Sequence, residues 1–312
     1  MRLSRTSLGL AVASATLGAI VWSANWAIRG FVRAPRCTGS KTPQDHGLTF
    51  STIKIPTAND KELNAWLIPS ARRGKAPAIV ILHGWGSNSE NMLPLTRPFH
   101  SAGFSLLLID ARCHGSSDED GFPSLPLFAE DLDHAIDWLR QQPSIDVANI
   151  SVLGHSVGAG AALFCASRRD DLRAVVSVAA FAHPEWIIRR LLESKRVPYR
   201  PFGWYALRYL EKLVGCSFDD MAPEKTIAGV RCPVLLVHGK QDETVPVGEA
   251  LRIFAKGRPD QVGLWILDGD HKFTAEHDMQ LSKVAVALAR WLRKPSGGAW
   301  HPAAKRMDFL GA

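Results

Sequence analysis

The sequence lacks the short motifs that mark metal-dependent and nucleotide-dependent enzymes. It contains no HExxH, no GxxxxGKS or GxxxxGKT and no convincing GxGxxG. Cysteine is scarce, and the five that occur are widely spaced, without a CxxC pair or a histidine at zinc-ligand spacing. We therefore expect no metal and no cofactor, and we interpret the thiols as buried or idle, a usage that leans towards a reducing compartment.

Acidic residues are absent from the first 36 residues, which carry five arginines. The formal net charge of the whole chain is +7, so this segment supplies five of the seven charges and leaves the rest almost neutral. A near-neutral body lacks the basic stripe that contacts phosphate groups. We therefore exclude nucleic acid as a partner.

The amino-terminal segment contains a long stretch without charge. Thr6–Ile28 would cross a hydrocarbon core of ~30 Å as a helix, and Trp22 and Trp26 near its end suit a membrane interface. A cleaved signal peptide is the alternative, but its small-x-small pairs fall within residues 11–15, inside the apolar run. The pattern predicts that residues 1–36 form a single-pass membrane anchor, whose orientation is left open because arginines flank both ends.

Apolar runs alternate with helix-period segments through residues 48–294. The runs are uninterrupted, as expected for strands that are buried on both faces of a parallel sheet. The expected strands are Thr49–Pro56, Glu62–Ile68, Ala78–Leu82, Phe104–Ile109, Ile150–Leu153, Ala174–Ala179, Val234–Val237 and Leu264–Leu267, and the expected helices include Leu125–Gln141, Ala159–Ser167 and Ala275–Leu292. This alternation predicts one α/β domain with a mostly parallel sheet and helices on both faces.

One connection in this pattern is too long for a single crossover helix. Between Ala180 and Cys232 lie about fifty residues that are rich in aromatic and basic side chains. We expect an inserted helical cap at about residues 182–230, with an ordinary pair of surface helices as the alternative. Periodicity is lost from Pro295 onward, so residues 295–312 are expected to form a loose tail.

The run Gly154-His155-Ser156-Val157-Gly158 stands between a predicted strand and a predicted helix. A sharp turn at that point strains the backbone of Ser156 and lifts its hydroxyl above the sheet, and glycine on both sides avoids clashes. His83-Gly84-Trp85-Gly86 ends an earlier strand, so the amide of Trp85 can face a developing oxyanion. The amide of Val157, at the start of the helix, is the second expected donor.

A serine nucleophile needs a general base, and His271 is the candidate of choice. It follows the last apolar strand, in a loop that opens at the same carboxyl edge of the sheet as Ser156. His155 adjoins the serine in sequence and is expected to point away from it. The acid that orients the base should come from the loop after the preceding strand, which provides Asp242. The alternatives for the acid are the neighbouring carboxylates Glu243 and Asp270.

These motifs, in the order Ser, Asp, His, resemble the α/β-hydrolase superfamily. Further support comes from Asp110–Ser116 (DARCHGS) and from the run HGKQDETVP that contains Asp242. Within the superfamily the pattern is similar to the serine aminopeptidase and monoacylglycerol-lipase-like branch, and the similarity spans Thr49 to Leu292. The resemblance implies an eight-stranded, mostly parallel sheet and no cofactor. The cap matches no family member that would identify the substrate.

The expected function is hydrolysis of carboxylic esters, including acylglycerols or other lipid esters, through an acyl-serine intermediate. A small-molecule ester or lipid is the expected substrate, and the membrane is the expected partner of the amino-terminal helix. An amidase, a peptidase or an acyltransferase would use the same three residues. A non-catalytic binding protein would have no need for all of them. Oligomeric state is left open.

Overall fold

The computed structural model describes residues 5–271 and 307–308 of the chain. All eight predicted strands form one sheet in the order β1-β2-β4-β3-β5-β6-β7-β8, and a ninth strand, β9, extends its edge beside β8. The strands are β1 (Ser51–Thr57), β2 (Lys61–Ile68), β3 (Ala76–Leu82), β4 (Ser105–Ile109), β5 (Ile145–His155), β6 (Ala174–Val178), β7 (Val234–Gly239), β8 (Val262–Leu267) and β9 (Met307–Asp308). The pairs β1–β2 and β2–β4 are antiparallel and the rest are parallel, so the mostly parallel, eight-stranded sheet predicted from the sequence is confirmed.

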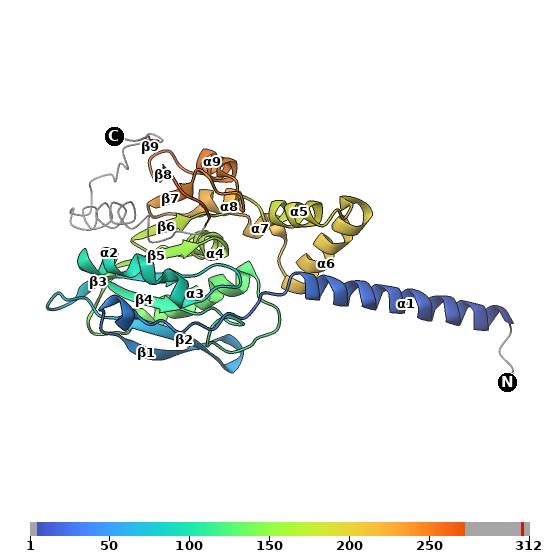
Figure 1. Ribbon diagram of the computed structural model, residues 1–312, viewed down its shortest axis with the longest axis horizontal. Coiled ribbons are helices and arrows are strands. Elements are labelled where there is room, and N and C mark those ends of the chain that lie inside the picture. The colour runs from blue at the N-terminus through green and yellow to red at the C-terminus, as the bar shows by residue number, and fades with distance from the viewer. Residues whose placement is uncertain (1–4, 272–306, 309–312) are drawn as a thin grey trace.

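Helices cover both faces of this sheet, as Figure 1 shows. The described helices are α1 (Arg5–Phe31), α2 (Thr96–Ser101), α3 (Leu125–Arg140), α4 (Val157–Ala166), α5 (Pro184–Ser194), α6 (Trp204–Val214), α7 (Phe218–Met221), α8 (Pro223–Thr226) and α9 (Val247–Lys256). Shorter turns are the 3-10 helices η1 (Pro43–His46), η2 (Ala58–Asp60), η3 (Ser89–Leu95) and η5 (Ile227–Gly229) and the π-helical turn η4 (Tyr199–Gly203). The predicted helix Ala275–Leu292 lies outside the described residues, as does the predicted tail apart from β9.

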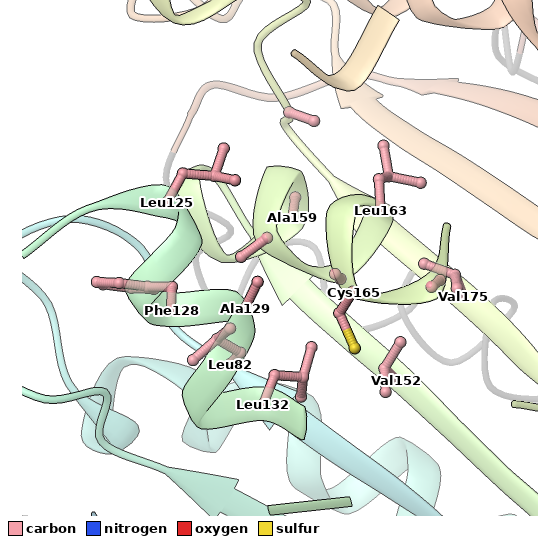
Figure 2. Packing of buried hydrophobic residues seen from close by; sticks show 14 of the residues in the cluster. Leu82, Leu125, Phe128, Ala129, Leu132, Val152, Ala159, Leu163, Cys165 and Val175 are labelled. Carbon is pink, nitrogen blue, oxygen red and sulfur yellow. The ribbon is translucent and has the colours of Figure 1, made fainter. Parts of the chain in front are cut away.

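The core is divided by the sheet into two apolar layers. Along β3, Val80 belongs to the layer beneath α3 and α4, whereas Ile79 and Ile81 belong to the opposite layer with Phe99 of α2. This alternation follows from the two-residue period of a strand. Figure 2 shows the first layer, in which Leu125, Phe128, Ala129 and Leu132 of α3 and Ala159, Leu163 and Cys165 of α4 meet Leu82, Val152 and Val175 of the sheet. Both layers fix the strand ends that carry the site.

The long connection between β6 and β7 is folded into α5, η4, α6, α7, α8 and η5. We call residues 182–230 the cap segment. Its first residue is bound to the body of the domain, because the Ala182 N–H donates to the Glu249 carboxylate of α9 at 2.8 Å. The same carboxylate pairs with Arg190 of α5. In Figure 1, α5 and α6 stand beyond the sheet, next to the carboxyl-terminal end of α1.

The prediction of a single-pass membrane anchor at residues 1–36 is wrong. Residues Arg5–Phe31 do form the long helix α1, but no helix in the described part of the chain is long and apolar enough to cross a membrane. The absence of charge was a poor guide because 14 of the 27 residues of α1 are Ala, Gly, Ser or Thr, which gain little on transfer into lipid. The predictions of a membrane partner and a membrane location depended on this anchor and are not supported either.

Candidate active site

Ser156 lies at the turn between β5 and α4 in a strained backbone conformation. Its φ and ψ are 55° and −116°, a combination that a residue with a side chain rarely adopts. The glycines on either side are required by close packing. A Cβ on Gly154 would lie 2.1 Å from the Gly158 carbonyl oxygen, and a Cβ on Gly158 would lie 2.3 Å from the carbonyl oxygen of His83. The turn therefore presents the serine at the carboxyl edge of the sheet.

His271 lies beside this serine, although 115 residues separate them in the sequence. Its Nε2 is 3.1 Å from the Ser156 hydroxyl oxygen, and its Nδ1 is 2.7 Å from Oδ2 of Asp242. Because an ionised carboxylate only accepts hydrogen bonds, Nδ1–H is the donor to Asp242 and Nε2 is left to accept the serine proton. The structure thus brings the three predicted residues, which lie in the loops after β5, β7 and β8, into one hydrogen-bonded chain.

Asp242 is buried, and both of its carboxylate oxygens are occupied. Oδ2 accepts from His271 and Oδ1 accepts from the Val245 N–H at 2.7 Å. Burial raises the pKa of the Asp242 carboxyl, but the hydrogen bonds from His271 and Val245 outweigh burial and hold the pKa below its ordinary value. The carboxylate is therefore anionic near neutral pH. The alternatives Glu243 and Asp270 are exposed, and the bond from His271 goes to Asp242.

The loop that carries Trp85 packs against the nucleophile. A Cβ on Gly84 would lie 3.1 Å from the Cβ of Ser156, so only glycine allows this approach without displacement. Val157 is the first residue of α4, where an amide has no partner within its helix. In the part of the chain that the structure describes, neither the Trp85 N–H nor the Val157 N–H donates to a protein acceptor. The amides of Trp85 and Val157 stay the predicted donors to a negatively charged oxygen.

Two buried histidines fix the backbone around Trp85. His83 accepts from the Ala111 N–H at 3.0 Å and donates to the Gly84 carbonyl oxygen at 2.7 Å. His114 accepts from the Gly86 N–H at 3.1 Å. Burial lowers the pKa of His83 to about 4 and also lowers the pKa of His114, so both rings are neutral near pH 7. A neutral ring can both accept and donate, as these bonds require.

His155 has a contact that sequence reasoning missed. Its Nε2–H donates to the backbone carbonyl oxygen of His271 at 2.8 Å, so the residue before the nucleophile holds the backbone of the base. Burial, reinforced by the nearby His271, lowers the pKa of His155 to about 4. The expectation that this ring points away from the serine gave no sign of the contact, because 116 residues separate the two histidines.

Residues 74–214 match the family model of the serine aminopeptidase, S33. An uncharacterized protein of Mycobacterium tuberculosis is 30% identical over 203 residues, which are 65% of this chain and 66% of that protein. The lysophosphatidylserine lipase ABHD12 of Rattus norvegicus is 24% identical over 253 residues, which are 74% of this chain and 62% of that protein. The chain thus spans about two thirds of the length of these curated relatives.

Solved structures show the same fold. The esterase Pf2001 of Pyrococcus furiosus superposes with a TM-score of 0.68 at 23% sequence identity, and the match covers 83% of this chain and 97% of the esterase. The strand order of this chain, its turn at Ser156 and the family model agree with one another. This chain has the α/β-hydrolase fold, and its residues 74–214 match the family that the serine aminopeptidase model describes.

Proposed function

We propose that this protein hydrolyses carboxylic esters through an acyl-serine intermediate on Ser156. The observation that carries the proposal is the hydrogen-bonded chain from Ser156 through His271 to Asp242, which starts at a strained turn. A hydroxyl on its own is a weak nucleophile near neutral pH, and this chain supplies the base and the anion that activate it. The match of residues 74–214 to a hydrolase family model adds independent support.

The proposed reaction has two stages. In the first, His271 accepts the Ser156 proton as the oxygen attacks the ester carbonyl, and Asp242 stabilises the imidazolium that forms. The amides of Trp85 and Val157 donate to the carbonyl oxygen as it becomes negative. His271 then protonates the leaving alcohol, which departs and leaves an acyl-serine. In the second stage water attacks the acyl group, again with His271 as base, and releases the acid.

We assign substrates with an apolar acyl group to this site. Three large aromatic side chains of the cap segment are exposed, Trp186 at 38%, Phe202 at 61% and Trp204 at 52%. Exposed aromatic rings of the cap segment offer an acyl chain a large apolar contact area. Tyr205 does not share this role, because its hydroxyl donates to Asn25 of α1 at 2.9 Å. One relative is named for the hydrolysis of a lipid, which agrees with this assignment.

A series of p-nitrophenyl esters from acetate to palmitate tests the proposal. We expect kcat/KM to rise with acyl length, and we expect the Trp204→Ala variant to lose that rise while it keeps activity towards the acetate ester. Trp22→Ala is the matched control, because Trp22 is also exposed but lies on α1. A folded protein that turns over no ester in the series would contradict the proposal.

Amide hydrolysis is the second candidate, and the family name favours it. The same acyl groups as p-nitroanilides separate the two, because an esterase cleaves the anilides far more slowly than the esters. Added methanol identifies acyl transfer, since a methyl ester then appears in place of part of the acid. Faster cleavage of the anilides than of the esters would contradict the esterase proposal and support amide hydrolysis.

A further inference from the structure

The chain that follows α1 packs against the loop that carries Trp85. We call residues 25–37, which are the end of α1 and the chain that follows it, the N-terminal arm. A Cβ on Gly86, whose φ is +63°, would lie 2.9 Å from the Cγ and Cδ of Pro35, so the Pro35 ring packs directly on the Gly86 backbone. Two residues further on, the Asn88 side-chain amide donates to the Cys37 carbonyl oxygen at 3.2 Å. The arm therefore contacts the loop at two points.

Arg36 binds the arm to a second loop. Its Nη2 donates to the Ser117 carbonyl oxygen, and its Nε lies 3.3 Å from Oε1 of Glu119. The Ser117 hydroxyl in turn donates to the carbonyl oxygen of Asp110, and the Asp110 carboxylate accepts from the Ser89 N–H at 2.8 Å. The arm, the loop after β4 and the start of η3 thus form one hydrogen-bonded unit beside Trp85.

The other end of the arm contacts the cap segment. The Tyr205 hydroxyl of α6 donates to the Asn25 side-chain oxygen at 2.9 Å, and Arg29 donates to the Tyr209 hydroxyl at 2.6 Å. In Figure 1 the end of α1 lies beside α6 and continues directly towards the sheet. One short stretch of chain therefore touches both the cap segment and the loop of Trp85.

From these contacts we infer that the N-terminal arm positions the loop of Trp85 and couples it to the cap segment. Gly86 is held on one side by His114 and on the other by Pro35. A shift of the loop would move the Trp85 N–H away from the developing oxyanion, and such a donor acts only when it is held in place. The inference rests on the proposed function, because it assigns the arm a role in stabilising the transition state.

Arg36→Ala in the full-length chain tests the positioning role. We expect kcat for p-nitrophenyl acetate to fall roughly tenfold with little change in KM, because a displaced oxyanion donor weakens binding of the transition state rather than of the substrate. Arg36→Lys keeps one donor for the Ser117 carbonyl oxygen and should restore part of kcat. Arg33→Ala is the matched control, since Arg33 is an exposed arginine of the same arm.

Tyr205→Phe tests the coupling, because it removes the hydrogen bond to Asn25 and keeps the ring. We expect Tyr205→Phe to lower kcat and the double variant with Arg36→Ala to lose less than the product of the two single losses. Urea unfolding of every variant provides the stability control. If Arg36→Ala does not fold, Asn88→Ala, which removes the bond to Cys37, takes its place.

Two results would overturn the inference. One is a kcat in Arg36→Ala equal to that of Arg33→Ala, and the other is a loss of activity that merely follows a loss of folded protein in urea. Multiplicative effects in the double variant would overturn the coupling to the cap segment. Failure of the proposed function is a different outcome, because the wild-type protein would then hydrolyse no ester.

Discussion

Replacing Asp242 by asparagine removes the anion beside His271 and changes almost nothing else in shape. In the wild-type protein both carboxylate oxygens accept hydrogen bonds, one from His271 and one from the Val245 N–H. Asparagine offers one oxygen and one amino group, so one of these two N–H groups must face a donor. If the oxygen stays with Val245, His271 has to present a bare Nδ1, and the proton then sits on Nε2, where it faces Ser156.

The wrong tautomer cannot accept the serine proton, so we expect Asp242→Asn to lower kcat on the order of 10⁴-fold, as the same change does in a serine protease. That factor corresponds to about 5 kcal/mol in the activation free energy. The assay is kcat for p-nitrophenyl butyrate, with urea unfolding to verify the fold. Glu243→Gln is the matched control, because Glu243 is an exposed carboxylate next to Asp242 in sequence. Equal and small losses in both variants would refute the assignment of the acid.

Two further predictions concern stability, both measured by urea unfolding. Gly154→Ala places a Cβ 2.1 Å from the Gly158 carbonyl oxygen and should lower the free energy of unfolding by ~3 kcal/mol. Gly248→Ala in α9, where a Cβ has nothing within 4 Å, should raise the free energy of unfolding by ~0.5 kcal/mol. Similar effects of the two changes would contradict the packing described around Gly154. The pKa values of His83 and His155 are lowered from 6.5 to about 4 in the folded protein. As pH falls below 6.5, these two histidines therefore bind protons in the unfolded chain but not in the folded chain. We therefore expect full stability above pH 6.5 and a loss of about 2 kcal/mol per histidine by about pH 5, and equal stability at both pH values would contradict this reasoning.

Much of the fold could be predicted because parallel strands leave a strong pattern in the sequence. Runs such as Ala78–Leu82 are buried on both faces of the sheet, so they are apolar at every position, and the structure confirms the sheet that they build. The turn at Ser156 could also be predicted, because the glycines on both sides of the serine are required by close backbone contacts. Chain order and strand position were enough to select His271 and Asp242, which the structure brings into contact with each other.

The parts that could not be predicted depend on contacts between distant segments. Nothing in the residues near His155 indicates that its ring binds the His271 carbonyl, and nothing near Pro35 indicates that it packs on Gly86. The membrane prediction was wrong for another reason. It relied on missing charges, and the small residues of α1 lower the apolar character that a membrane span requires.

The central claim is that Ser156 is the nucleophile that carries the acyl group, and covalent labelling tests it most directly. Full-length protein and the Ser156→Ala variant are treated with a fluorophosphonate, and the adduct is mapped by mass spectrometry after digestion. We expect one adduct on the wild-type protein, on the peptide that contains Ser156, and none on the variant, which should also lose ester hydrolysis by on the order of 10⁶-fold. A folded wild-type protein that remains unlabelled, or a folded variant that keeps its turnover, would contradict the account.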